Sequence, residues 1–129
     1  MKIGITSTGR DLSATVDPRF GRCPYFIVID LDSMEYECIE NEYTMAPGGA
    51  GIRSAQKIIE KGVKTLITGN IGPNAFQTLS VAGIRVITGA AGTVRDVVER
   101  FKKGELDETS SPTVGSHFGM GGMGRRGRD

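Results

Sequence analysis

Three residues whose side chains could bind an anion or a soft metal ion lie within five positions of one another. They lie near the end of a long segment that has no apolar periodicity, and they are Arg19, Arg22 and Cys23. Guanidinium groups bind anions, and a neighbouring arginine lowers the pKa of a thiol and favours the thiolate, which soft metal ions prefer. We therefore predict that Cys23 is an exposed metal ligand. The alternatives are a small buried apolar cysteine and ordinary surface arginines.

Two further arginines extend this basic group, and glycine-bearing loops lie close to it in the predicted fold. Arg10 belongs to the same long segment, and Arg53 stands at the start of a predicted helix. Three loops precede predicted helices, where free backbone N–H groups and the positive end of the helix dipole bind anions. They are residues 46–51, 69–73 and 89–92, and their predicted binding residues are Gly48, Gly49, Gly51, Asn70 and Gly72. Alternatively, these glycines only satisfy the backbone geometry of turns.

Sequence motifs for catalysis are missing from the part of the chain that is predicted to fold. The only histidine, His117, lies beyond it, so a Ser–His–Asp triad cannot form there. No GxxxxGK[ST] phosphate loop and no HExxH zinc motif is present. Two cysteines cannot supply the four thiolates of a self-contained iron–sulfur site, and Cys38 lies within a predicted strand, where a structural role is expected. We therefore expect a binding protein rather than an enzyme.

The elements that must position these residues follow from apolar periodicity and turn signals. Alternating or continuous apolar residues predict strands, and apolar residues at helical spacing predict helices. The strands are expected at 2–7, 25–31, 34–41, 64–68 and 84–88, and the helices at 52–61, 74–82 and 93–103. A hairpin followed by alternating helices and strands predicts an α/β fold, with a mixed five-stranded sheet covered by helices on both faces. Ligands of such sheets bind beyond the carboxyl ends of the strands.

The composition predicts one domain and a tail. Residues 1–104 have the length of a single small domain, whereas residues 105–129 are rich in Gly, Arg, Ser and Thr and are expected to be disordered. A formal net charge of +1 argues against binding to long nucleic acids. No apolar run is long enough for a membrane span, and we expect no leader segment, because Met1 leads straight into an alternating strand pattern. We therefore expect a cytoplasmic protein with reduced thiols.

Two motifs resemble those of a known family. The segments 17–26 (DPRFGRCPYF) and 66–76 (LITGNIGPNAF) are similar to the dinitrogenase iron–molybdenum cofactor biosynthesis family, and the resemblance extends over residues 1–103. It implies a ribonuclease H-like, three-layer α/β/α fold with strand order 3-2-1-4-5 and an antiparallel second strand. It also implies non-catalytic, transient binding or carriage of an iron–sulfur or iron–molybdenum–sulfur cluster. Nitrogenase-linked members often have histidine where this chain has Arg19, which leaves Cys23 as the nearest soft ligand.

Three functions remain open from the sequence. The first is a carrier of an anionic metal–sulfur cluster or its precursor, which would exchange cargo with donor and acceptor proteins as a monomer or weak homodimer. The second is a small enzyme or sensor that binds a phosphorylated metabolite or nucleotide at the same sheet edge. The third is a regulatory module that binds a partner protein.

Overall fold

The predicted strands and helices all form, with small shifts at their ends. A computed structural model of the chain describes residues 1–45 and 47–114. In order, the elements are β1 (Lys2–Ser7), β2 (Tyr25–Asp30), β3 (Tyr36–Glu40), α1 (Ala50–Glu60), β4 (Thr65–Ile67), α2 (Pro73–Val81), β5 (Arg85–Ile87) and α3 (Val94–Lys102). Within the described ranges, none of the helices has the length and hydropathy that crossing a membrane requires.

The strands form one mixed sheet in the order β3-β2-β1-β4-β5, which confirms the predicted topology. β2 runs antiparallel to both β1 and β3, whereas β1, β4 and β5 are mutually parallel. β1 and β4 therefore end at the same edge of the sheet. The long loop after β1 and the loop after β4 start from that edge, as the sequence predicts.

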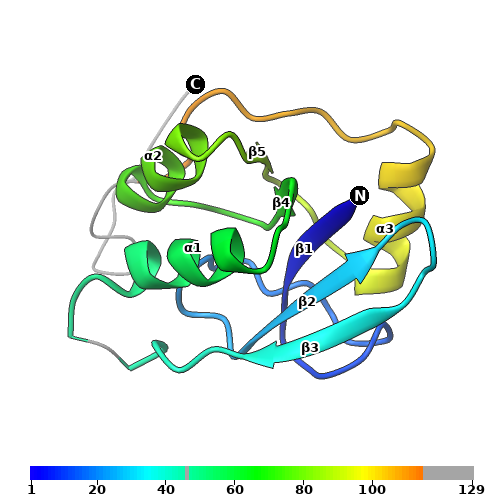
Figure 1. Cartoon of the computed structure of the whole chain (residues 1–129), viewed down its shortest axis with the longest axis horizontal. Coiled ribbons are helices and arrows are strands. Elements are labelled where there is room, and N and C mark those ends of the chain that lie inside the picture. The colour runs from blue at the N-terminus through cyan, green and yellow to red at the C-terminus, as the bar shows by residue number, and fades with distance from the viewer. Residues whose placement is uncertain (46, 115–129) are drawn as a thin grey trace.

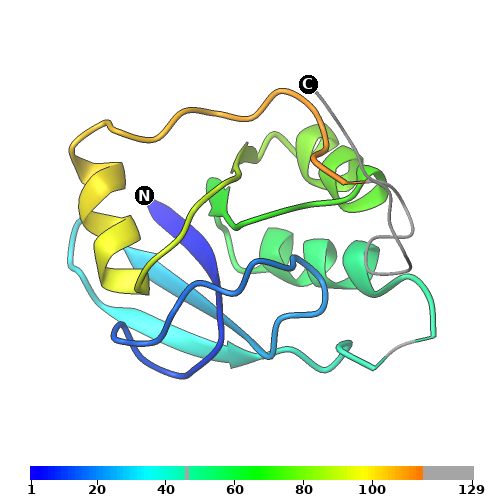
Figure 2. The same ribbon diagram turned by 180° about the vertical axis from the view of Figure 1, so that it is seen from behind.

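Side chains that alternate along each strand build two apolar cores, one on each face of the sheet. Phe26 and Val28 of β2 pack with residues of α1 and α2, whereas Ile27 and Ile29 pack with residues of α3. The two faces can be followed in Figures 1 and 2, where α1 and α2 lie on one side of the sheet and α3 lies on the other. The α/β/α layering is therefore built from strands that are apolar on both faces.

The predicted capping box at the start of α3 is confirmed. The Thr93 hydroxyl accepts a hydrogen bond from the Asp96 N–H at 3.0 Å, and the Asp96 carboxylate accepts one from the Thr93 N–H at 3.4 Å. These bonds satisfy two backbone donors that the first helical turn leaves without partners. The amino-terminal end of α3 is thus capped by Thr93 and by Asp96 in its first turn.

Residues 105–114 correct the predicted boundary of the tail. This segment, here called the strap, runs from α3 past β5 to α2 (orange in Figures 1 and 2). The Thr109 N–H donates to the Val86 carbonyl at 2.7 Å, and the Thr113 N–H donates to the Ile71 carbonyl at 3.0 Å. Leu106 packs against the core on the α3 side. The expectation of disorder from residue 105 is therefore wrong for the strap, and for residues 115–129 it lies outside the described residues.

Hydrogen exchange tests the docking of the strap. We expect the amide protons of Thr109 and Thr113 to exchange at least about tenfold more slowly than in an unstructured peptide, because both are hydrogen-bonded to the domain. Amide exchange followed by NMR measures this protection residue by residue. Exchange of both amides at the unstructured rate would show that the strap does not dock.

Candidate functional site

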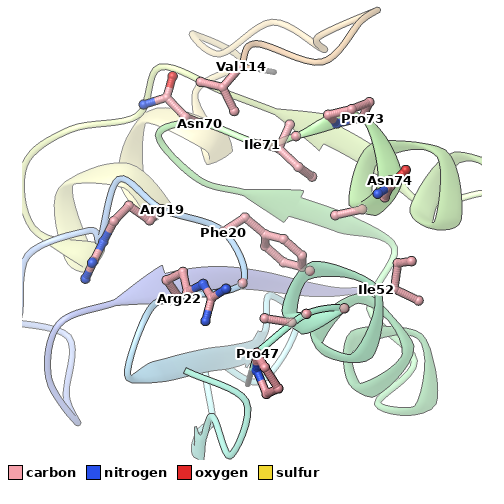
Figure 3. A pocket seen from close by; sticks show the side chains of 17 residues that line it. Arg19, Phe20, Arg22, Pro47, Ile52, Asn70, Ile71, Pro73, Asn74 and Val114 are labelled. Carbon is pink, nitrogen blue, oxygen red and sulfur yellow. The ribbon is translucent and has the colours of Figure 1, made fainter. Parts of the chain in front are cut away.

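A pocket of about 390 Å³ lies where the loop after β1 meets the amino-terminal ends of α1 and α2. Figure 3 shows Arg19 and Arg22 on one side of this pocket and Ile52 and Asn74 on the other. The lining comes from three separate segments and from the end of the strap. Its residues are Arg19, Phe20, Gly21, Arg22, Pro47, Gly48, Gly49, Ala50, Gly51, Ile52, Asn70, Ile71, Gly72, Pro73, Asn74, Ala75 and Val114.

Backbone hydrogen bonds join the loop after β1 to the loop after β4. The Asn70 N–H donates to the Pro18 carbonyl at 2.7 Å, and the Phe20 N–H donates to the Asn70 carbonyl at 3.1 Å. Gly69 allows this approach, since a Cβ there would lie 2.6 Å from the Pro18 Cα. The pairing fixes the position of Arg19 beside Asn70.

A second close approach joins the same loop to the start of α1. Gly21 has a φ of 98°, and a Cβ there would lie 3.1 Å from the Gly51 Cα. Gly51 in turn faces α2, since its own Cβ would lie 3.3 Å from the Cβ of Ala75. The glycines therefore let three backbone segments approach one another, and the pocket opens between them.

The two helices that begin at the pocket have no side-chain caps. Gly49 and Gly72 are their N-cap residues, neither helix has a side-chain cap hydrogen bond among the described residues, and neither first turn carries an acidic residue. By contrast, the amino-terminal end of α3 does have a side-chain cap, the capping box of Thr93 and Asp96. The free N–H groups and partial positive charges of α1 and α2 are thus available to an anion in the pocket.

Arg19 is held in place by a buried carboxylate. Asp17 is 2% exposed and accepts hydrogen bonds from the Arg19 backbone N–H at 2.9 Å and from its guanidinium at 3.3 Å. The hydrogen bond and the negative charge of Asp17 raise the pKa of Arg19 above its ordinary value. Half of the Arg19 side chain remains exposed. Asp17 therefore positions Arg19 and offsets part of its charge.

The other three arginines of the predicted basic group differ in their positions relative to the pocket. Arg22 lines the pocket and donates to the Thr44 carbonyl at 2.7 Å, which ties the two loops together. Arg10 lies over the Tyr25 ring at 4.7 Å, and Arg53 lies over the Tyr43 ring at 5.8 Å. Neither of these two lines the pocket, so the predicted cluster of four arginines is wrong and reduces to Arg19 and Arg22.

Cys23 does not have the environment that the sequence predicts. Its side chain is 0% exposed and packs in the core with Phe26 and Ile58, outside the pocket lining. Burial, together with the nearby Asp17 carboxylate, raises the pKa of the thiol from 9.0 to about 12. The predictions of an exposed thiol with a lowered pKa are therefore wrong. Adjacency to Arg22 in sequence has no such effect when the cysteine faces the core.

The remaining predicted binding residues are placed as expected, with one loop excepted. Gly48, Gly49, Gly51, Asn70 and Gly72 all line the pocket. The loop at residues 89–92 does not; its first residue, Gly89, instead donates its N–H to the Gly69 carbonyl at 2.8 Å. Cys38 is half-buried and lies on β3, the strand in which the sequence places it, and its structural role stays a prediction. Within residues 1–45 and 47–114, no three His, Cys, Asp or Glu side chains gather as a metal site.

Sequence reasoning missed a buried asparagine that shapes the pocket wall. The Asn41 amide donates to the carbonyls of Gly21 at 3.0 Å and Cys23 at 2.8 Å, and its oxygen accepts from the Tyr43 N–H at 3.0 Å. Asn41 is 6% exposed. A polar residue at the end of a predicted strand is the only sequence signal for it, and it does not indicate which distant carbonyls the amide would reach.

Comparisons with known proteins identify a family and several relatives with the same fold. The family described as dinitrogenase iron-molybdenum cofactor matches residues 1–104. An uncharacterised protein of Methanocaldococcus jannaschii is 32% identical over 111 residues, covering 84% of this chain and 91% of that protein. The apo form of the orange protein from Desulfovibrio gigas is 40% identical with a TM-score of 0.85, covering 88% of this chain and 96% of that one. A candidate NifB protein from Thermotoga, solved by NMR, is 40% identical with a TM-score of 0.77, covering 88% and 97%.

Substitution of Gly69 tests the close approach that forms the pocket wall. We expect Gly69→Ala to lower the free energy of unfolding by about 1–3 kcal/mol, because the added Cβ overlaps the backbone of Pro18. Gly48→Ala is the matched control, since a Cβ there meets nothing within 4 Å, and it should change stability by less than about 0.5 kcal/mol. Denaturant unfolding measures both. Equal stabilities would contradict the tight contact.

Alkylation tests the burial of Cys23. With iodoacetamide at pH 8, we expect the folded protein to be modified at Cys38 while Cys23 stays unmodified, because Cys23 is inaccessible and its pKa is about 12. Peptide mass spectrometry distinguishes the two sites. Both thiols should react once the protein is unfolded in guanidinium chloride, which is the control. Rapid modification of Cys23 in the folded protein would show that its thiol is exposed.

Proposed function

Because this chain belongs to the dinitrogenase iron-molybdenum cofactor family, we propose that its pocket binds and carries an anionic metal–sulfur cluster or the precursor of one. The cluster is cargo that is received and released, and the protein catalyses no reaction on it. We also propose that the exchange takes place with cluster donor and acceptor proteins. One relative at 40% identity was solved in an apo form, a term for a protein that lacks a bound group.

The observation that carries this proposal is the pair of uncapped helix ends at one pocket. α1 and α2 both begin there without a side-chain cap or an acidic residue in the first turn, and Arg19 and Arg22 stand opposite. Backbone N–H groups, helix dipoles and guanidinium groups all favour a negative charge. These features together support the binding of an anion that carries several charges.

The composition of the lining fits cargo that must be released. The lining residues are glycines, apolar residues, two asparagines and two arginines, so binding would rest on electrostatic attraction and hydrogen bonds. Such contacts hold an anion without covalent bonds to its metal atoms. They also exchange faster than a set of thiolate ligands would.

The same donors would also accept the phosphate group of a metabolite or nucleotide, which is the second candidate. Free N–H groups at helix ends bind phosphate in many proteins, and α1 and α2 offer them here. A thermal-shift comparison separates the two candidates. Stabilisation by nucleotides or sugar phosphates, together with no uptake of a metal–sulfur species, would favour the phosphate ligand.

The substitution Asn74→Asp tests the anion site without weakening the fold. Asn74 is exposed at the pocket in the first turn of α2. An aspartate there should maintain or raise thermal stability through the helix dipole but repel an anionic cargo. We expect about fivefold weaker binding, which corresponds to ~1 kcal/mol. Protein incubated anaerobically with iron(II), sulfide and molybdate, then desalted, would be assayed by visible absorption and metal content.

Two controls make this test specific. Gln77→Glu adds the same charge about one turn further along α2, outside the pocket, and should retain uptake close to that of the unsubstituted protein. Arg10→Gln removes a guanidinium that lies over Tyr25 rather than at the pocket, and should also retain it. Uptake that is the same in Asn74→Asp as in these controls would contradict binding at this pocket.

A further inference from the structure

The end of the strap holds the backbone of Ile71, a residue of the pocket lining. The Thr113 N–H donates to the Ile71 carbonyl at 3.0 Å, and the Thr113 hydroxyl accepts from the Ile71 N–H at 2.9 Å. The Val114 N–H also donates to the Ile71 carbonyl, at 3.3 Å. Both backbone polar groups of Ile71 therefore have partners in the strap.

The same stretch of chain also pairs with the loop after β1. Asn70, the residue before Ile71, exchanges backbone hydrogen bonds with two residues of that loop. Figure 3 shows Ile71 between Val114 of the strap and Phe20 of the loop. Gly72, the N-cap residue of α2, follows directly. The strap and the loop therefore fix together where α2 begins at the pocket.

Few buried side chains attach the strap to the rest of the domain. Leu106, Thr109 and Val114 are half-buried, and the other residues of the strap are exposed. Glu108 pairs with Arg85 at 3.3 Å, and both of these side chains are more than half exposed. A segment that is held mainly by exposed hydrogen bonds opens at a lower free energy than the core does. The strap is therefore expected to detach while the sheet and helices stay folded.

We propose that Thr113 is a positioning residue of the pocket, and that docking of the strap and binding of the cargo stabilise each other. Docking fixes the start of α2 and places Val114 in the pocket lining. When the strap detaches, the N–H groups of α2 are no longer held opposite Arg19 and Arg22, and the affinity for the cargo falls. Because such coupling is reciprocal, bound cargo favours the docked strap. This inference rests on the proposed function, since it describes how release of the same cargo is regulated.

Amide exchange in the protein without cargo tests the positioning role by itself. Thr113→Val keeps the size of the side chain but removes the hydroxyl that bonds to the backbone before α2. We expect the Phe76 amide, which donates to the Gly72 carbonyl in the first turn of α2, to exchange about fivefold faster in this variant. The Arg53 amide, which donates to the Gly49 carbonyl at the start of α1, should keep its rate. Thr113→Ser should restore the rate at Phe76, and an unchanged rate in Thr113→Val would overturn the positioning role.

Dissociation of the cargo tests the coupling. Protein loaded anaerobically with iron(II), sulfide and molybdate would be diluted into buffer with a chelator, and the loss of the visible absorption followed. We expect Thr113→Val to lose its cargo about fivefold faster than the unsubstituted chain, and Thr113→Ser to lose it at nearly the unsubstituted rate. Thr8→Val is the matched control, because Thr8 is also exposed, its hydroxyl also donates to a backbone carbonyl, and it does not line the pocket. Equal rates in Thr113→Val and the unsubstituted chain would overturn the inference.

Amide exchange in the loaded protein gives the reciprocal readout. The Thr109 amide should exchange about fivefold more slowly with cargo bound, because opening of the strap is then coupled to loss of the cargo. Thr109 does not line the pocket, so the cargo does not shield it directly. Unchanged exchange at Thr109 in a loaded sample would overturn the coupling and leave the pocket proposal standing. If the unsubstituted chain takes up no cargo, the proposed function and the coupling fail together, and exchange at Phe76 without cargo still decides the positioning role.

Discussion

The pairing of the loop after β1 with the loop after β4 is the contact on which the rest of the site depends. Pro18 and Phe20 exchange backbone hydrogen bonds with Asn70, and Gly69 allows the two chains to approach because it has no Cβ. Residues 8–24 have no apolar periodicity of their own, so tertiary contacts must fix this loop. Once it is fixed, Arg19, Gly21 and Arg22 face the starts of two helices.

This arrangement concentrates positive charge at one edge of the sheet, although the net charge of the chain is only +1. The α1 and α2 ends add partial charges, Arg19 and Arg22 add full ones, and Asp17 offsets part of that sum from its buried position. The fold closes the start of α3 with a capping box but leaves the other two helices without one. An anion bound in the pocket would take the place of the missing caps, so ligand binding and local stability are physically linked.

The Cys23 thiol shows that burial has a larger effect on its pKa than the arginine next to it in sequence. Cys23 stands between Arg22 and Pro24 in sequence, yet its side chain faces the core, and desolvation raises its pKa to about 12. Its backbone is held by the Asn41 amide, which also binds the Gly21 carbonyl. Asn41 thus supports the loop that carries Gly21 and Arg22 at the pocket. Cys23 contributes packing behind that wall.

The sequence by itself determined the elements, and the family resemblance implied the order of the sheet. Seven of the eight predicted site residues line one pocket, and their binding of a ligand stays a prediction. Alternating apolar residues, the Thr93 capping box and the glycine turns are local signals, because they act between residues that are close in the chain. The tertiary structure alone decided that Cys23 is buried, that Arg10 and Arg53 lie away from the pocket, and that the strap docks. Each of these depends on contacts between residues far apart in sequence, such as the hydrogen bonds between Thr113 and Ile71. Side-chain exposure and pKa follow from such contacts, since they depend on which other segments exclude water from a group.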